Sequence, residues 1–589
     1  MTAIGVLAPD VRVNGTSLPA NWLIAITGLR VERALCLIAR TTLRFADWGY
    51  QLSADNKFAL GTAVSIAVQG GGELMSGVVT GVSLEQSSSD SPELVVTVDD
   101  QGYRLALGTN VRTFLQASYA DALSQVMGGA GLSLKNSSTK LAGINDYLLQ
   151  GGSDLAFLDS ITRRAGAVWW VEGGALCIED VGADKGSVGV VLMEDLTEFS
   201  VRASALRPTG VTVTGWDANA QQDVKGENET PGTTATSDFV SAYIGDKPQS
   251  LHKSVQSSFD QNPVNASDAG ILANAMYNDV VASAVTARGS GLINPAIKLM
   301  TKVNVTGAGP ASGSYVVSQV EHIFRTDGFY TRFVAGPIRP GGLVDTLGPS
   351  APDPGFEIAG LLTAVVTNLA DPDNVGRVKV KYSAAGGAIE SAWARIVGLG
   401  VGKGRGSEFL PEINDEVLVG FERGDSRHPV VLGGLFSKEN KLPSGTAAVT
   451  NNEVNFRRIT SRLGHVIEMG DGSGESDQHL QLVLAGGEHK LRLGKDRFEL
   501  EVPARIPVSI KAGDAKFVID GQGNVTIEGN KITLKATTQV DIEGSAGVAL
   551  KSDSKVAVQA AMIDVKAEGT ASVDGGGMLT LKGGMVAIN

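Results

Sequence analysis

The sequence predicts a mainly β protein that ends in an intertwined triangular β-helix made by three chains. Apolar residues at positions i and i+2 recur every seven or eight residues from Val525 to Ile588. This unit is too short for one coil of a single-chain solenoid, whose repeats run about 20 residues or more, so it fits one side of a triangle. Upstream, short strand-like segments lie between turns, and aromatic residues make up only 5% of the chain, which favours thin layers of strands over a large aromatic core.

Composition narrows the class of protein. A chain of 589 residues is long enough for about three or four domains. The formal charge of -13 argues against broad binding to nucleic acid or to an anionic membrane. Cys36 and Cys177 are the only cysteines, so we expect no disulfide framework and no cysteine-based metal site. No cofactor is expected either.

The chain start and the hydropathy pattern predict where the protein is made. Residues 1–13 lack the basic start and the apolar core of a signal peptide. No run of about 20 apolar residues is present to span a bilayer. We therefore expect synthesis in the cytoplasm.

Two helices are predicted within residues 1–345, which otherwise read as strands. Ser118 and Asp121 form a capping box for a helix that ends near Gly128. Ser153 caps a second helix that ends at Gly166. A hairpin with strands at 168–171 and 175–178 follows the second helix. The polar segment 217–236 is predicted to be a surface loop.

Residues 346–589 divide into four predicted parts. Residues 346–356 carry closely spaced prolines and read as a linker. Residues 357–440 contain about five short strands, which suit an OB-type barrel. Residues 441–516 read as a strand-rich connector, and residues 517–589 carry the repeat.

The repeat places two apolar side chains on one face of every short strand, because residues i and i+2 point the same way. Ala571 and Val573 fill the one position where the pattern is weaker. The residues predicted to form the core between three chains are Val525, Ile527, Ile532, Leu534, Val540, Ile542, Val548, Leu550, Val556, Val558, Ile563, Val565, Leu579 and Leu581. A lone chain cannot bury these pairs, so the prediction is a homotrimer with a shaft of roughly 40 Å.

Acidic and basic residues alternate along the repeat almost without exception. The residues that follow successive pairs are Glu528, Lys535, Glu543, Lys551, Gln559, Lys566, Asp574 and Lys582. They could form inter-chain ladders that fix the register, or simply a solvated face. Exposed ion pairs contribute about 0–1 kcal/mol each, so both interpretations stay open.

A series of motifs carries a resemblance to a known family. The segments are Gly376–Val380 (GRVKV), Trp393–Arg395, Leu410–Ile413, Glu416–Val419, Phe421–Asp425 with His428–Pro429, and the terminal stretch 581–589. In this order they resemble the central spike of contractile injection systems, which includes phage-tail needles and the valine–glycine-repeat spikes of type VI secretion. The helix, the Trp169–Trp170 pair and the hairpin at 153–179 resemble the tail-hub domain that seats such a spike.

The resemblance implies a function. A homotrimer of this kind caps the inner tube, contacts baseplate proteins and pierces the target membrane, which it touches only transiently, when the sheath contracts. Its blunt end carries a tip protein of the PAAR type, and effector cargo can travel with it. The residues implied for tip binding are Gly583, Gly584, Met585, Val586, Ala587, Ile588 and Asn589. The order of the parts is most like an extracellular or phage-like particle, and a type VI spike is the alternative.

An enzymatic role is not expected. The span between Phe436 and the repeat is too short for the lysozyme domain of the phage needle, and no domain follows Asn589 in the sequence. A polysaccharide-degrading β-helical tail spike would need long single-chain coils and a carboxylate cleft. An OB-fold nucleic-acid binder would need a basic, aromatic strand face.

Isolated motifs are given structural interpretations. The glycine run 398–406 departs from a Walker phosphate loop, and Asp371 with Asp373 reads as a tight turn rather than a calcium loop. Asp99 and Asp100 are interpreted as solvated carboxylates at a strand end. The Trp169–Trp170 pair is expected to lie half in the core and half at an interface. The histidines interpreted as ordinary surface or loop residues are His322, His428, His465, His479 and His489.

Overall fold

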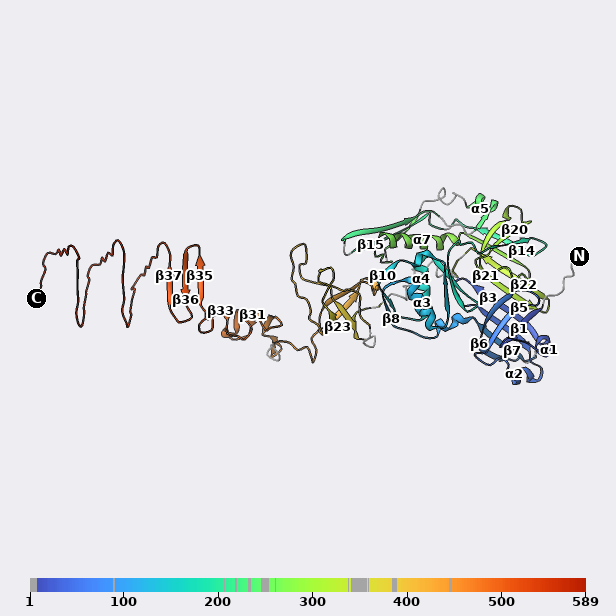
Figure 1. Cartoon of the computed structure of the whole chain (residues 1–589), viewed down its shortest axis with the longest axis horizontal. Coiled ribbons are helices and arrows are strands. Elements are labelled where there is room, and N and C mark those ends of the chain that lie inside the picture. Colours follow the sequence, from blue (N-terminus) through green and yellow to red (C-terminus); the bar gives the residue numbers. More distant parts are fainter. Residues whose placement is uncertain are drawn as a thin grey trace. The chain divides into compact units, whose positions relative to one another are not determined.

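A computed structural model describes most of the chain. The described residues are 8–87, 91–205, 207–217, 220–230, 235–244, 254–259, 261–336, 338–339, 358, 360–383, 389–443 and 448–588. The chain divides into two units, Met1–Lys441 and Leu442–Asn589. Strands outnumber helices among the described residues (Figure 1), so the mainly β class is confirmed. The linker predicted at 346–356 and the tip residue Asn589 lie outside the described residues.

The first unit is built on a 14-stranded sheet. Its main path runs β14-β19-β22-β21-β3-β4-β7-β6-β5-β1-β2, and β13, β17 and β20 extend it beside β21. The strands are β1 (Pro9–Val13), β2 (Thr16–Ser17), β3 (Ile26–Ala34), β4 (Arg40–Ala46), β5 (Ala63–Val68), β6 (Glu73–Glu85), β7 (Glu93–Asp99), β13 (Ser187–Val191), β14 (Leu196–Ala203), β17 (Ala235–Ser237), β19 (Val285–Leu292), β20 (Lys302–Thr306), β21 (Gly313–Arg325) and β22 (Gly328–Ala335). Short helices α1 (Ala20–Ile24), α2 (Gln51–Asp55) and α5 (Asp238–Tyr243) connect them.

Both helices predicted from their caps are confirmed. In α3 (Tyr119–Gly129) the Ser118 hydroxyl accepts a hydrogen bond from the Asp121 backbone N–H at 3.0 Å, and the Asp121 carboxylate accepts from the Ser118 N–H. In α4 (Asp154–Ala165) Ser153 accepts from the Ala156 N–H, and Gly166 ends the helix in the left-handed region. The predicted hairpin is also present, as β11 (Ala167–Glu172) and β12 (Ala175–Asp180).

Smaller sheets complete this region. β9 (Ser133–Asn136) joins β12, and β8 (Arg112–Ser118) pairs with β10 (Ile144–Gln150). β15 (Gly210–Asp217) lies between β16 (Gln222–Asn228) and β18 (Val255–Ser258), and α7 (Ala266–Ala282) packs on this three-stranded sheet.

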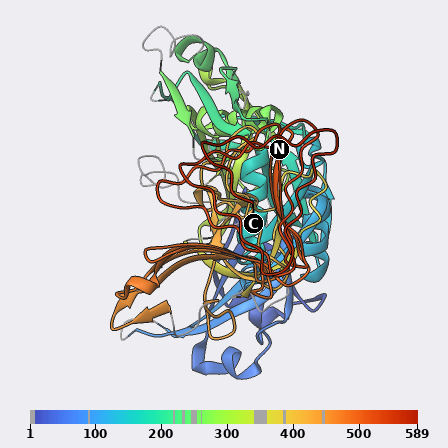
Figure 2. The same ribbon diagram turned by 90° about the vertical axis from the view of Figure 1, so that its left-hand side faces the viewer.

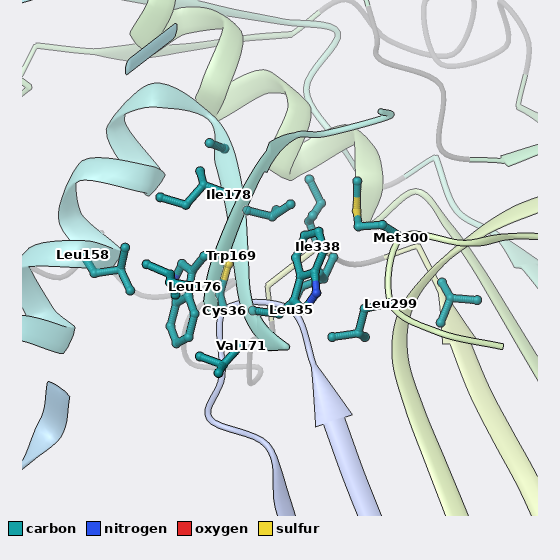
Figure 3. Packing of buried hydrophobic residues seen from close by; sticks show 14 of the residues in the cluster. Leu35, Cys36, Leu158, Trp169, Val171, Leu176, Ile178, Leu299, Met300 and Ile338 are labelled. Atoms are coloured by element: carbon teal, nitrogen blue, oxygen red, sulfur yellow. The ribbon is translucent and has the colours of Figure 1, made fainter. Parts of the chain in front are cut away.

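Helix α4, the β11–β12 hairpin and the sheet share one core. Figure 3 shows Trp169 and Leu176 of the hairpin beside Leu158 of α4, with Leu35 and Ile338 on the other side. Both Trp169 and Trp170 are buried, so the expectation that this pair lies half at an interface was wrong. The two tryptophans point to opposite faces of β11, and both faces are covered.

The barrel is a separate five-stranded sheet of order β24-β23-β26-β27-β25. Its strands are β23 (Leu362–Asn368), β24 (Lys379–Tyr382), β25 (Arg395–Ile396), β26 (Glu416–Phe421) and β27 (Pro429–Gly434). Its core includes Val380, Tyr382, Val417 and Val419, all nearly inaccessible to solvent.

The second unit consists of antiparallel strands followed by an extended segment. β28 (Val449–Thr450) pairs with β29 (Glu453–Val454). A five-stranded sheet follows with β30 (Phe456–Thr460), β31 (Val466–Asp471), β32 (Gln478–Val483), β33 (Lys490–Gly494) and β34 (Phe498–Glu501), and then β35 (Val508–Ala512), β36 (Ala515–Ile519) and β37 (Val525–Glu528). Residues 529–588 carry no assigned strand or helix in this part of the described chain. Viewed along this segment, successive passes of the trace overlap (Figure 2).

Three further expectations were wrong. The polar segment 217–236 contains β16, whose Val224 is buried against α7 while the polar residues alternate outward. His322 is buried in β21, and burial lowers its pKa to about 3. Asp99 and Asp100 are buried rather than solvated: Asp99 pairs with Arg40, and Asp100 accepts from the Ala39 and Gly102 N–H groups. Burial raises the pKa of Asp100 to about 6 against these hydrogen bonds.

The close packing of β16 on α7 makes a testable prediction. A Cβ on Gly226 would lie 2.2 Å from the backbone carbonyl of Ala269, whereas a Cβ on Gly270, the next residue of α7, meets nothing within 4 Å. Gly226→Ala should therefore destabilise this unit by about 1–3 kcal/mol, and Gly270→Ala should stabilise it by roughly 0.5–1 kcal/mol. Thermal unfolding of both variants checks this, and equal melting temperatures would contradict the packing.

Candidate functional site

Arg377 in the GRVKV motif stabilises the turn before β24. Its guanidinium donates to Asp371, with Nη2 at 2.7 Å from Oδ1, and it also contacts Asp373. Asp371 further accepts from the backbone N–H groups of Asp373, Val375 and Arg377. These hydrogen bonds, first of all those from Arg377, hold the pKa of Asp371 well below its usual range. The expectation of a tight turn at 371–374 is confirmed.

Asp425 and Arg427, in the motif that ends at Pro429, form an ion pair between the barrel and the N-terminal region. Arg427 donates to Asp425 through Nε and Nη2, the latter at 2.7 Å, and both side chains are less than a tenth exposed. Arg427 Nη2 also donates to the backbone carbonyl of Asn262 at 3.1 Å. In return Asn262 Nδ2 donates to the carbonyl of Glu422 at 3.0 Å. These hydrogen bonds connect the barrel to Asn262, which lies in the segment before α7.

The same segment is also bonded to α4. Arg164 donates to the carbonyl of Gln261 at 2.9 Å and to Asp268 at 2.7 Å, and it reaches the Asn262 carbonyl at 3.5 Å. Asn262 therefore accepts from one arginine of the barrel and from one of α4. We name the set Arg164, Asn262, Asp268, Asp425 and Arg427 the junction cluster.

The charged side chains of the junction cluster are largely buried, which strengthens the interactions between them. Burial alone raises the pKa of Asp425, but the charge of Arg427, together with His428, lowers it far below the ordinary value. Breaking a buried pair by removing one partner costs about 3–5 kcal/mol, since the other charge stays buried and unpaired.

Strand β10 contributes to two hydrophobic cores. Leu148 packs in the core around α3 and α4, whereas its neighbours Tyr147 and Leu149 pack in the barrel core with Val366 and Val380. Alternate residues of a strand point to opposite faces, so one strand serves both. The barrel and the N-terminal region are therefore joined by a shared strand as well as by the junction cluster.

The single chain does not bring the predicted trimer-core residues together. All fourteen are exposed, between 52% and 83%. The backbone hydrogen bonds within 529–588 close tight turns, Gly544–Gly547 and Gly575–Met578. Strands need a hydrogen-bonded neighbour, and this described segment finds none within its own chain. The trimer core stays a prediction on this structure.

The predicted tip residues are also exposed. Met585 is 89%, Val586 53% and Ile588 84% accessible. Gly583, Gly584 and Ala587 lie among them outside any assigned strand or helix, and the chain bends at Gly584.

The other motifs show no catalytic arrangement. The glycine run 398–406 forms a small hairpin in which Gly402 and Arg405 exchange backbone hydrogen bonds. The described residues contain no group of three or more His, Cys, Asp or Glu side chains placed to hold a metal ion. His479 is half-buried in β32, where its Nε2 lies 3.0 Å from Glu468 Oε1, so its interpretation as a surface residue was wrong.

A hollow of about 1100 Å³ lies beside α4, lined by residues that include Cys36, Arg288 and Phe333. Burial raises the pKa of the Cys36 thiol to about 11, outweighing the opposite effect of Arg339. A thiol with this pKa is protonated at neutral pH, and the thiolate is the reactive form. Burial thus keeps Cys36 in its less reactive, protonated form at neutral pH.

Two family models match the chain. Residues 362–436 match the type VI secretion system/phage-baseplate injector OB domain, and residues 4–325 match the Alg8 N-terminal domain. The barrel and the first match show that the chain carries an injector OB domain of the kind found in type VI secretion systems and phage baseplates. The second match covers more than half of the sequence, and the chain belongs to the Alg8 N-terminal domain family.

Similar proteins are named as spikes. The type VI secretion system spike protein VgrG5 of Pseudomonas aeruginosa is 36% identical over 135 residues, 22% of this chain and 16% of VgrG5. VgrG1a of the same organism is 24% identical over 234 residues, 36% of each chain. The structure titled Francisella PdpA-VgrG complex, half-lidded, aligns at a TM-score of 0.49 and 8% identity over 89% of this chain and 88% of that one. The alignments thus cover 16% of VgrG5 and 36% of VgrG1a.

The described part of the chain contains no helix that is long and apolar enough to cross a membrane.

The sequence pattern did not reveal three members of the junction cluster, Arg164, Asn262 and Asp268. An available signal was the Asn262–Pro263 dipeptide, because Asn tolerates a positive φ and here adopts one of 42°. Nothing in the local sequence indicates that this carbonyl faces a barrel residue more than 160 positions away.

The junction cluster generates a prediction on stability. Arg427→Met should lower the free energy of unfolding of the barrel by about 3–5 kcal/mol, because Asp425 stays buried with the imidazole of His428 as its remaining ionisable neighbour. Adding Asp425→Asn should recover part of this loss, since the unpaired charge is removed. Arg405→Met, at an exposed arginine that donates to Gly400, is the matched control and should change little. Calorimetry measures all three, and an unaffected Arg427→Met variant would contradict the pairing.

The Arg427→Met variant should also invert the pH dependence of the stability that Asp425 contributes. In the wild type the folded-state pKa of Asp425 is lowered, so its stabilisation is present above the unfolded value of about 3.9 and is lost as pH falls below it. Without Arg427, burial raises the folded-state pKa above the unfolded one, and stability falls as pH rises. The difference in melting temperature between Arg427→Met and the wild type should therefore widen from pH 4 to pH 7, and a constant difference would count against this explanation.

Proposed function

We propose that three copies of the chain form the piercing spike of a contractile injection particle. The N-terminal regions seat on the inner tube and contact baseplate proteins, the barrels form a collar, and the repeat forms a shaft driven through the target membrane when the sheath contracts. The spike is a structural part and catalyses no reaction. It is made in the cytoplasm, assembled into the baseplate and delivered outward on firing, with effector cargo carried on it.

The exposure of the repeat is the observation that carries this proposal. In the single chain, 52–83% of each predicted core side chain faces solvent. Neighbouring large apolar side chains that are exposed together mark interaction sites. Copies of the same repeat offer both the apolar partners and the backbone hydrogen bonds that residues 529–588 lack within this described segment.

The junction cluster supports a mechanical role. A collar that passes force from the N-terminal region to the shaft must not hinge at the barrel. The buried pair of Asp425 with Arg427 and the shared strand β10 both resist such a hinge. In this proposal, the barrel motif that contains Asp425 and Arg427 therefore makes the protein rigid and has no catalytic role.

Type VI secretion is the second candidate setting. The spike proteins of Pseudomonas aeruginosa that align with this chain belong to type VI systems. The same trimeric spike serves either kind of particle, so the proposal for the shaft is unchanged.

The shaft gives a direct test. Val548→Asp would place three carboxylates around one axis, and each buried, unpaired charge costs several kcal/mol. The neighbouring Ala549→Asp points to the opposite face and is the matched control. We expect a heat- and detergent-resistant shaft in the wild type and in Ala549→Asp, and its loss in Val548→Asp with the N-terminal region still folded. Native mass spectrometry and gel mobility after mild heating provide the measurement.

Two outcomes would contradict this assembly. A wild-type chain that is monomeric or dimeric at micromolar concentration removes the basis of the proposal. Equal behaviour of the two aspartate variants means that Val548 does not point toward the axis.

The tip gives a second test. We expect Gly583 to Asn589 to bind a small conical protein of the PAAR type, one copy per trimer, through the exposed Met585, Val586 and Ile588. Deletion of these seven residues should abolish capture of that partner and leave the trimer intact, because about eight repeats remain. A pull-down with full-length and truncated spikes compares them, and equal recovery would place the tip elsewhere.

A further inference from the structure

The hollow beside α4 extends across one face of the large sheet. Its floor is formed by residues of β14, β19, β22, β21, β3 and β4, which are neighbours in that order. The start of α4 and the loop 36–38 border it. Its volume of about 1100 Å³ exceeds the range of about 300–1,000 Å³ that is usual for small-molecule sites. A segment of polypeptide therefore fits its size better than a small molecule does.

A row of polar and charged side chains crosses this floor. The pairing register aligns Glu198 of β14, Ser290 of β19, Arg332 of β22, Glu321 of β21 and Glu32 of β3, and all five line the hollow. Paired residues of neighbouring strands lie on the same face of a sheet. Glu198, Arg332 and Glu32 thus form a series of alternating charge in which each member stands two strands from the next.

These three charges are accessible to a ligand. Glu198 is exposed and has no ion pair among the residues that the structure describes. The side chain of Arg332 is 55% exposed and reaches Glu321 only at 3.9 Å, so its other donors can bind a second carboxylate. The side chain of Glu32 is 44% exposed and pairs with Arg30 through Oε1, and a carboxylate has a second oxygen with which to accept.

The spacing of the three charges fits one conformation of an extended peptide. Neighbouring strands lie about 4.8 Å apart, so charges two strands apart are separated by about 9.6 Å. In a polyproline II helix every third residue faces the same way, and three residues rise about 9.3 Å. A segment in this conformation, with a charge at every third position, would meet Glu198, Arg332 and Glu32 in turn. The residues between those charges can contact Leu37 and Leu155 at the border of the hollow.

We propose that the hollow binds an extended polypeptide segment in the polyproline II conformation, in which basic, acidic and basic residues follow one another at intervals of three. The inference rests on the proposed function, in which the spike carries cargo, and it assigns the recognition of that cargo to the sheet of the first unit. The bound segment is then selected by its charge pattern rather than by an apolar anchor.

Calorimetric titration of the full-length protein with two blocked peptides tests this site. The matching probe is acetyl-Lys-Pro-Pro-Glu-Pro-Pro-Lys-amide, and acetyl-Glu-Pro-Pro-Lys-Pro-Pro-Glu-amide has every charge reversed. Each probe has the same charge pattern in both chain directions, so the comparison does not depend on the direction of binding. The wild type should bind the matching probe at least about fivefold more tightly than the reversed probe, because exposed ion pairs are replaced by repulsion.

A charge-swapped variant separates the site from general attraction between opposite charges. Glu198→Lys combined with Arg332→Glu leaves the net charge of the chain unchanged, and it should invert the preference between the two probes. Arg325→Glu changes an exposed arginine of β21 that does not line the hollow, and it should keep the preference of the wild type. If the double variant melts well below the wild type, Glu198→Lys alone should still weaken binding of the matching probe.

The outcomes for this inference and for the proposed function are distinct. No binding of either probe at roughly 1 mM, equal affinity for both probes, or an unchanged preference in a folded double variant would each overturn the inference and leave the trimer standing. A single-copy mass for the wild type would instead overturn the proposed function, whereas the selectivity for the matching probe would still support the peptide site.

Discussion

The repeat depends on two conditions: its short strands must form backbone hydrogen bonds, and its apolar pairs must be buried. A single chain meets neither condition. Eight residues make one short strand and a bend, so a copy cannot fold back to pair with itself. In the structure, residues 529–588 are extended and their apolar pairs are exposed. The strands from β30 to β37 likewise carry most of their large apolar side chains on one face.

The first unit differs from the repeat, because its hydrophobic cores are buried within a single chain. Its barrel shares β10 with the N-terminal region, and a buried ion pair spans the two. Buried pairs contribute little net stability compared with apolar residues, but they tolerate few alternative geometries. A part that transmits force benefits from a single geometry more than from extra stability.

Much of this organisation was predictable where the determinants are local. The caps at Ser118 and Ser153, the hairpin after α4 and the two-residue alternation are read from neighbouring positions, and the structure confirms them. Burial of His322, of Asp99 and of Val224 was missed, because it depends on what distant segments cover. Arg164 and Asn262 were missed for the same reason: their partners lie far away in sequence. The trimer core and the tip residues remain predictions, since their proposed neighbours are other molecules.

The shared strand β10 has a consequence for how such proteins recombine. The family model of the barrel starts at residue 362, yet Tyr147 and Leu149 complete the barrel core from some 200 positions upstream. A chimera that exchanges the barrel at its sequence boundaries would pair one parent's core with the other's β10 and leave mismatched volumes inside. Viable crossovers should carry the paired strands β8 and β10 along with the barrel. The segments exchanged together would then be discontinuous in the gene.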